Sequence, residues 1–375
     1  MSYKILLSGY FGFDNVGDEA ILHAMVKGIR NEIPEAELVA LSANPEFTAR
    51  KNGIRSIDRM SILKLIKELR DTDLFISGGG SLFQDVTSKR SMLYYLAVVY
   101  IAKKIFKKKV MIYSQGIGPV IHEDNRKKLA KLFNQLDVIN VRDENSKEEL
   151  KSMGVTKQID VTTDTVFSLR KPTFQVGKDI LEQNGIDTKK FTLGISMRSW
   201  KDCTNNIIEE VSKMIELLKD KDMNIVLLPF HFPHDLDISE KIFESTKLKE
   251  EDNCKLHVLR NLMTEEAFLS VMVNMDIVLS MRLHGLIFAT VCNAYPIAIS
   301  YDPKVYSLFK EMKREVPMDV RDIDAHNLVD QILNAMENID ELKEITSDTA
   351  EFMREKALKN NKMVKELLKS ENFRD

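Results

Sequence analysis

Short apolar runs alternate with longer amphipathic segments along the whole chain, and this alternation limits the fold more than any other feature. Such apolar runs are typical of buried strands in parallel sheets, and the segments between them are typical of crossover helices. The strands expected in the first half are Lys4–Leu7, Leu38–Leu41, Leu74–Ser77, Val110–Tyr113, Val138–Val141 and Ile159–Thr162. A second series follows Lys171-Pro172, with its clearest members at Thr192–Ser196, Asn224–Leu228, Ile277–Ser280 and Pro296–Ser300. We therefore predict an α/β protein with two Rossmann-like domains that face each other across a cleft.

The chain is long enough for two separate cores, with 375 residues of which 44% are hydrophobic. We expect an acceptor-side domain at 1–170 and a donor-side domain at 171–340, joined by the polar segment SLRKPTFQVGKD at 168–179. Residues 341–375 form a charged segment that contains no glycine or proline. We expect a C-terminal helix there that crosses back to the N-terminal domain.

Charge and cysteine content exclude several classes of protein. Residues 1–170 carry a formal charge of +5 and the remainder −8, which is too mild to favour nucleic acid as a partner. The three cysteines, Cys203, Cys254 and Cys292, fit neither a disulfide framework nor a zinc site and favour the cytoplasm. No apolar run reaches the roughly 18 residues of a membrane-spanning helix. The N-terminal stretch is expected to form the first strand and not a signal peptide.

Glycine-rich loops follow three expected strands of the first half. Ligands of open α/β sheets bind beyond the carboxyl ends of strands, so these loops are candidate binding sites. In the first loop, residues 8–20, Asn15 and Asp18 are candidates to hold or deprotonate a hydroxyl group, although Asp18 alternatively caps the following helix. In the second loop, Gly79 and Gly80 have no side chains, so an anion or sugar could approach the backbone closely. Tight domain packing is the alternative explanation for these glycines.

Cations and imidazoles follow the strands of both halves. Arg142 follows an expected strand of the first half, where an ion pair with Asp143 or Glu144 is the structural alternative. The second half provides Arg198, His231, His234, Arg282, His284 and Lys304 at the equivalent places. Four loops that each deliver such a group favour a lined pocket for an anion. His231 and His234 have no strong third ligand nearby, so we expect no metal ion and no cofactor.

The motifs SGYFGFDNVGDEAIL, SGGGSLFQD, VRDE, SMRLHGLIFA and SYDPK together resemble the polysaccharide pyruvyl transferases. The resemblance covers most of the chain and is nearest to the bacterial branch that adds a pyruvate ketal to cell-wall polysaccharide for surface-layer anchoring. It implies a GT-B-like fold and phosphoenolpyruvate in place of a nucleotide sugar. It also implies that Arg142, His284 and Lys304 are essential residues, with Asn15 and Asp18 less securely placed.

The implied chemistry accounts for the residue types. Phosphoenolpyruvate carries about three negative charges, which Arg142, Arg198, Arg282 and Lys304 could meet. Protonation of its C3 atom requires an acid that works near neutral pH, and we assign this role to His284. Asp18 would take the proton of the acceptor hydroxyl. The alternative for His284 is a structural histidine at a helix start.

The segment 91–109 is a mostly apolar helix that ends in five lysines. We expect either a buried crossover helix or a peripheral contact with the inner membrane leaflet, near a lipid-linked oligosaccharide acceptor. Two other functions stay open. One is a glycosyltransferase that uses a nucleotide sugar, and the other is a non-catalytic glycan-binding protein of the same fold.

Overall fold

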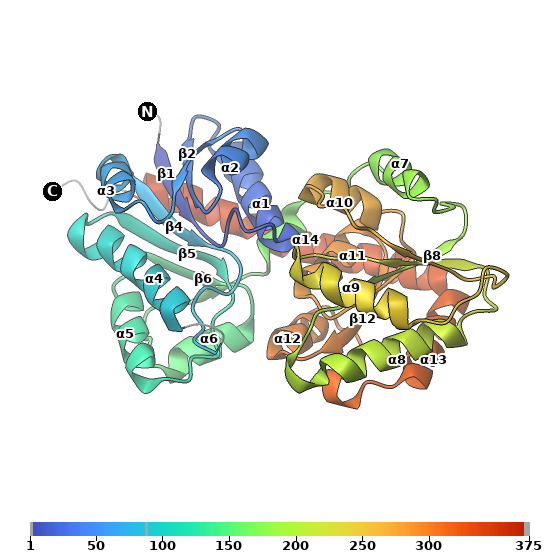
Figure 1. The fold of residues 1–375 in the computed structure, drawn as a ribbon. Helices are drawn as coiled ribbons and strands as arrows, with labels where there is room; N and C mark the ends of the chain where they lie inside the picture. The colour runs from blue at the N-terminus through green and yellow to red at the C-terminus, as the bar shows by residue number, and fades with distance from the viewer. Residues whose placement is uncertain (1–2, 87–88, 371–375) are drawn as a thin grey trace. The chain divides into compact units, whose positions relative to one another are not determined.

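The chain folds into two compact units, each built around one parallel β-sheet (Figure 1). The computed structural model describes residues 3–86 and 89–370. Unit 1 comprises residues 1–13, 18–168 and 353–375, and unit 2 comprises residues 14–17 and 169–352. The short stretch Asp14–Gly17 therefore groups with unit 2, although it lies early in the chain.

Unit 1 contains a seven-stranded sheet in the order β3-β2-β1-β4-β5-β6-β7. Its strands are β1 Lys4–Ser8, β2 Glu37–Ser42, β3 Arg55–Asp58, β4 Leu74–Gly78, β5 Lys109–Gln115, β6 Val138–Val141 and β7 Asp160–Val161. The strands pair in parallel. Its helices are α1 Val16–Glu32, α2 Pro45–Asn52, α3 Ile62–Asp71, α4 Lys89–Tyr100, α5 Glu123–Phe133 and α6 Glu144–Ser152.

Unit 2 contains a six-stranded sheet in the order β10-β9-β8-β11-β12-β13. Its strands are β8 Phe191–Ser196, β9 Met223–Leu227, β10 Lys255–Val258, β11 Ile277–Ser280, β12 Tyr295–Ser300 and β13 Met318–Asp319. Its helices are α7 Gln175–Gln183, α8 Thr204–Leu217, α9 His234–Ser245, α10 Glu265–Met272, α11 Leu283–Cys292, α12 Pro303–Glu311 and α13 Ala325–Glu337. The two parallel sheets with connecting helices confirm the predicted α/β class with two Rossmann-like folds.

The central strands are buried on both faces, as their near-continuous apolar sequences require. All five residues of β4 are buried, and so are all four of β11. Short edge strands were missed by the sequence analysis. β3, β10 and β13 lack a long apolar run, and their residues are mostly only half-buried.

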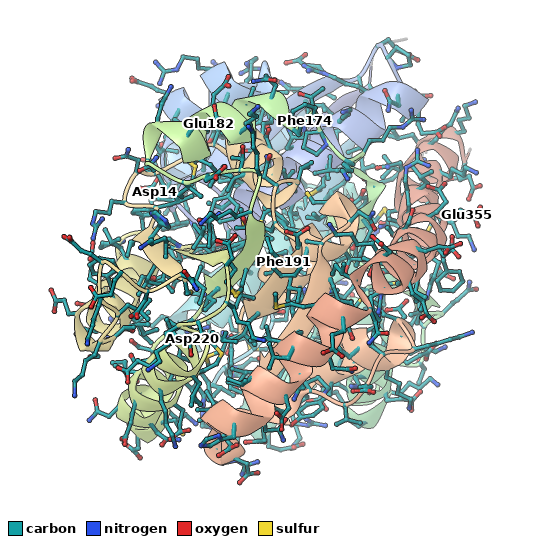
Figure 2. All side chains as sticks on the ribbon, turned by 90° about the vertical axis from the view of Figure 1, so that its right-hand side faces the viewer. Asp14, Phe174, Glu182, Phe191, Asp220 and Glu355 are labelled. Carbon is teal, nitrogen blue, oxygen red and sulfur yellow. The ribbon has the colours of Figure 1, made fainter. Side chains whose placement is uncertain are left out.

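Two segments differ from the sequence prediction. The expected linker 168–179 already contains the start of α7, whose Gly177 donates its backbone N–H to Ser270 Oγ at 2.7 Å. Phe174 and Glu182 mark the two ends of this short helix in Figure 2. The expected helix 91–109 ends earlier, because α4 continues as a π-helix over Ile101–Ile105 and Lys109 begins β5.

The last helix, α14, spans Ile339–Lys369. From Met353 onward it belongs to unit 1, where Asn361 Oδ1 accepts a hydrogen bond of 2.7 Å from Tyr113 on β5. Lys365 pairs with Glu32 at the end of α1 at 2.9 Å. Within residues 3–86 and 89–370, no helix combines the length and apolar character needed to cross a bilayer.

Candidate functional site

The carboxyl ends of four neighbouring strands of unit 2 carry most of the predicted site residues. The sheet places β9, β8, β11 and β12 side by side in that order. His231 follows β9, Arg198 follows β8, Arg282 and His284 follow β11, and Lys304 follows β12. The parallel topology therefore brings these predicted residues to one edge of a single sheet, as the sequence analysis expected.

Arg282 forms a buried ion pair with Asp235, the second residue of α9. Asp235 is only 1% exposed, and its Oδ2 also accepts the backbone N–H groups of Phe230 and His231 at 3.3 and 3.0 Å. This carboxylate ties the loop after β9 to the loop after β11. Arg282 is consequently held in position, while part of its charge is neutralised by Asp235.

His231 and His234 lie close together, with ring centroids 5.0 Å apart. Burial lowers the pKa of His231, and the positive charge of Arg282 lowers it further, against the opposite effect of Asp235. His231 is therefore a neutral hydrogen-bonding group near pH 7 and not a cation. Among the described residues, no group of three His, Cys, Asp or Glu side chains is arranged to hold a metal ion.

The lowered pKa of His231 predicts a loss of stability on the acid side. Above about pH 6.5, the ordinary pKa of histidine, folded and unfolded chains are both neutral at this position. Below it, the unfolded chain takes up a proton that the folded chain resists, so the free energy of unfolding falls as the pH falls. A His231→Gln variant should lose less melting temperature than the wild type between pH 7.5 and 5.5. His326→Gln, at an exposed position, is the matched control, and an unchanged pH dependence in His231→Gln would contradict the prediction.

Arg198, just after the end of β8, lies beside two aromatic side chains. Its Nη1 donates to the Tyr301 hydroxyl at 2.8 Å, and its guanidinium lies 5.0 Å from the Tyr301 ring and 5.5 Å from the Trp200 ring. The Trp200 and Tyr301 rings are 4.4 Å apart. Within the described residues, Nε of Arg198 and Nε of Arg282 are buried and make no hydrogen bond. Each is a donor that an anionic ligand could accept.

His284 occupies the first turn of α11, which begins directly after Arg282. Ser280 Oγ accepts the backbone N–H of Arg282 at 2.9 Å and shapes this turn. The imidazole of His284 lies against Gly17, where an added Cβ atom would collide with the ring. The turn therefore places Arg282 and His284 outside the apolar core. That core includes β11 and residues Gly285–Cys292 of α11, all of which are buried.

Asn15 joins the same unit through backbone contacts with the loop after β9. It forms an isolated antiparallel bridge with His231, and the next residue, Val16, donates to the Phe230 carbonyl at 3.0 Å. Its side-chain Oδ1 accepts the Gly17 N–H at 3.1 Å, which is the bond expected of a helix-capping residue. The alternative that Asp18 caps this helix is thus wrong, because α1 begins at Val16 and Asp18 is its third residue.

Lys304 lies in the first turn of α12, the helix that follows β12. Its Nζ is 3.5 Å from Asp302, whose other oxygen caps the helix by accepting the Lys304 N–H at 3.0 Å. Lys304 is about one-fifth exposed. It therefore combines an ion pair at the helix start with partial access to solvent.

The remaining predicted residues belong to unit 1. Gly79 and Gly80 have left-handed φ angles of 66°, and Asp18 Oδ1 lies 3.1 Å from the place where a Cβ of Gly80 would be. Gly79 also accepts a hydrogen bond from the buried Gln115 side chain at 3.1 Å. Burial and the Asp18 carboxylate both raise the pKa of Tyr10. The glycine turn thus allows Asp18 to approach the backbone closely, within unit 1.

Arg142 is buried in a polar network of unit 1. It contacts Asp164 at 3.2 Å, Asp143 at 3.5 Å and the Ser81 hydroxyl at 3.2 Å. The pairing with Asp143 is the structural alternative named above, whereas Asp164 was missed. A ligand bound by Arg142 would therefore share its guanidinium group with these two carboxylates.

Sequence reasoning also missed Asp235 and Gly17 as site residues. Asp235 holds together two loops of unit 2. Gly17 is one of the glycines of the first loop, residues 8–20. Its position five residues after another glycine gives no signal that it lies against an imidazole 267 residues further along the chain.

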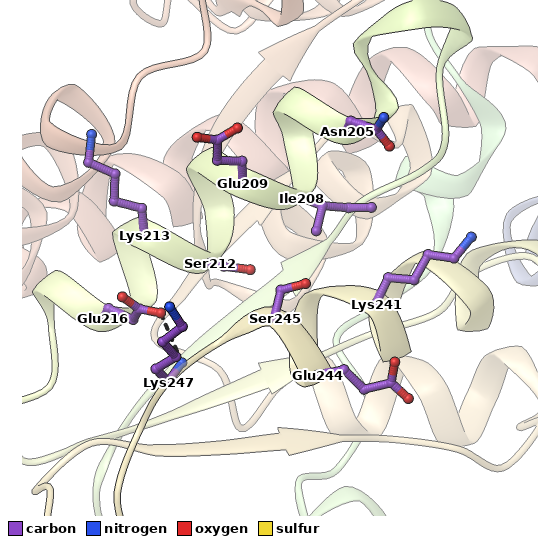
Figure 3. A pocket seen from close by; sticks show the side chains of 10 residues that line it. All are labelled: Asn205, Ile208, Glu209, Ser212, Lys213, Glu216, Lys241, Glu244, Ser245 and Lys247. Atoms are coloured by element: carbon purple, nitrogen blue, oxygen red, sulfur yellow. Dashed lines mark hydrogen bonds between the residues drawn. The ribbon is translucent and has the colours of Figure 1, made fainter.

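A groove of about 580 Å³ lies elsewhere on unit 2, between α8 and α9 (Figure 3). None of the predicted site residues lines it. Its side chains include both lysines and glutamates, and Glu216 accepts the backbone N–H of Lys247 at 2.9 Å. This mixed lining, away from the strand ends, does not define a specific anion site.

Solved structures with a similar fold include HepE of Anabaena in complex with UDP-glucose. That structure aligns with a TM-score of 0.65 at 14% identity over 98% of this chain and 99% of that chain. A UDP-N-acetylglucosamine 2-epimerase from Listeria monocytogenes, described as putative, gives 0.65 at 14% identity over 96% and 94%. Sucrose-phosphate synthase from Thermosynechococcus elongatus gives 0.63 at 11% identity over 97% and 99%.

These likenesses place the fold in the GT-B class. No curated protein matches the chain in sequence. The family model of the polysaccharide pyruvyl transferases matches residues 15–303, which is most of the chain. The protein therefore belongs to the polysaccharide pyruvyl transferase family and is a transferase.

Proposed function

We propose that the protein transfers pyruvate from phosphoenolpyruvate, as a ketal, to a sugar of a lipid-linked cell-wall polysaccharide precursor and releases phosphate. Membership of the family supports pyruvyl transfer. Phosphoenolpyruvate is a cytoplasmic metabolite, so the reaction would take place in the cytoplasm, at the inner face of the membrane. The modified polysaccharide would serve in surface-layer anchoring, as in the branch that the sequence resembles.

The observation that carries the proposal is the row of basic groups along the β9-β8-β11-β12 edge. A small anion with a carboxylate and a phosphate needs several donors from separate directions. Arg198, Arg282 and Lys304 come from three different loops of one sheet, and the buried Nε atoms of both arginines lack protein partners in the described chain. Neutral His231 adds a hydrogen bond without adding charge.

The proposed reaction has three bond changes at C2 of the donor. His284 donates a proton to C3, and an acceptor hydroxyl adds to C2 as Asp18 takes its proton. The bond from C2 to the phosphate oxygen then breaks, and a second hydroxyl of the same sugar adds to C2, closes the ketal ring and gives its proton to the released phosphate. Arg142, Gly79 and Gly80 of unit 1, together with Asn15, would bind the reactants.

A nucleotide-sugar glycosyltransferase is the second candidate, because HepE of Anabaena has this fold and was solved with UDP-glucose. A two-domain fold serves both chemistries, so the fold does not decide between them. A non-catalytic glycan-binding protein is the third candidate. It would not need the titratable groups that line the strand ends of unit 2.

Trp200 offers a direct test, because it is the only tryptophan of the chain and lies beside Arg198. We expect phosphoenolpyruvate to change the Trp200 fluorescence in a saturable way, and UDP-glucose to have no effect at the same concentration. With a lipid-linked disaccharide added, phosphate release should accompany the mass increase of a ketal. Saturable binding of UDP-glucose with glycosyl transfer would favour the second candidate, and glycan binding without turnover would favour the third.

A further inference from the structure

Helix α3 presents an unusual apolar surface to solvent. Met60 and Ile62 are 69% and 67% exposed, Leu63 is 83% exposed and Ile66 is 37% exposed. The opposite side of the helix is well anchored, since Leu65 and Leu69 are buried in the core of unit 1. The outward apolar side chains are therefore not the result of a poorly packed helix. Such a cluster marks an interaction surface.

Most of the exposed charged side chains of the same helix are basic, and Asp71 at its last position is the acidic exception. Lys64, Lys67 and Arg70 are exposed. Glu68 is the only acidic residue between 59 and 70, and it is buried and paired with Lys4 at 2.7 Å and Arg55 at 3.2 Å. The solvent side of α3 is thus apolar and, with three exposed basic side chains against one exposed carboxylate, net cationic.

Helix α4 and its π-helical extension continue this surface. Tyr94 of α4 donates to the Arg59 carbonyl at 2.8 Å, and Lys108 donates to the Arg70 carbonyl at 2.8 Å, so the two segments meet at both ends of α3 (Figure 1). Residues 89–109 contain no acidic residue. Among residues 90–109, the exposed side chains are Arg90, Leu93, Ala97, Tyr100, Lys104, Ile105 and Lys107.

The lysines within residues 103–109 contribute less to such a surface than their number suggests. Lys103 pairs with Asp137 at 2.6 Å, and Lys109 donates to the carbonyls of Leu367 and Ser370. With Lys108 bound to Arg70, three of the five lysines serve the fold. The exposed apolar and basic groups are therefore shared between this segment and α3, which the sequence analysis did not single out.

We propose that the exposed faces of α3 and α4, here called the α3–α4 face, dock onto an anionic phospholipid bilayer. Apolar side chains would enter the interface while the basic residues meet lipid phosphates. A second copy of the chain is a poorer partner, because a two-fold dimer would oppose this cationic face to itself. The inference goes beyond the proposed function, since it requires neither donor nor acceptor sugar.

The test is flotation of the full-length protein with vesicles of phosphatidylcholine alone or mixed with phosphatidylglycerol, without any sugar substrate. We expect binding to the anionic vesicles only, weakened by salt. Leu63→Glu should lower the partition coefficient by at least about tenfold, and Lys64→Gln with Lys67→Gln by about fivefold per charge. Val316→Glu is the matched control, because Val316 is 82% exposed but lies in unit 2.

Equal partitioning of wild type and Leu63→Glu would overturn the proposal. So would a wild-type dimer, measured by light scattering, that becomes a monomer in Leu63→Glu. Both variants change exposed side chains and should melt within a few degrees of the wild type. Because no substrate is present, the result is independent of whether phosphoenolpyruvate is the donor.

Discussion

An Asp235→Ala variant should unfold with a free energy lower by about 3–5 kcal/mol, the cost of leaving one member of a buried ion pair without its partner. Asp235 is 1% exposed and Arg282 is 15% exposed, so water can replace the lost carboxylate only in part. Two backbone N–H groups, those of Phe230 and His231, also lose their acceptor. Urea unfolding of unit 2, followed by the fluorescence of Trp200, measures this change.

Asp237→Ala is the matched control on the same helix. Asp237 also forms an ion pair, with Lys241 at 2.8 Å, but its side chain is 63% exposed. Its removal should cost less than about 1 kcal/mol. If Asp235→Ala proved as mild as Asp237→Ala, the buried pair would not organise the strand ends of unit 2.

The strands that could be predicted from sequence are those with continuous apolar runs. β4 and β11 are buried throughout, and their continuous apolar sequences already indicate this burial. The edge strand β3, with the sequence RSID, is held by pairing with β2, and three of its four side chains are polar or charged. Ile57 alone of its four side chains is apolar and packs against the core, so the strand conformation of β3 comes from a neighbouring strand and not from its own pattern.

The position of a site residue could be predicted from sequence where it follows from the parallel topology alone. Arg198, His284 and Lys304 each follow a strand, and adjacent strands bring them to one edge. The partners of these residues depend on packing between distant segments, which a single sequence does not reveal. Asp235 is 47 residues from Arg282, and Asp164 is 22 residues from Arg142. The neutral state of His231 likewise follows from burial and nearby cations.

A His284→Gln variant should lose about 10²–10⁴-fold in kcat for pyruvyl transfer, the range expected when a general acid is removed. Glutamine keeps a hydrogen-bonding side chain of similar reach but has no proton to give to C3. The residue lies in the first turn of α11 against Gly17. The substitution should therefore leave the melting temperature nearly unchanged. Phosphate release in the presence of acceptor measures kcat, and the Trp200 fluorescence titration measures donor binding.

Donor binding and turnover, compared between two variants, distinguish a general acid from a residue that only positions the substrate or stabilises the fold. Lys304→Gln removes a charge that would contact the donor before and during the reaction, so it should mainly weaken phosphoenolpyruvate binding. His284→Gln should instead leave donor binding within a few fold and remove the step that follows. A stable His284→Gln or His284→Ala variant with normal turnover of phosphoenolpyruvate would exclude His284 from the chemistry. The proton for C3 would then have to come from another group, and the basic edge of unit 2 would serve binding alone.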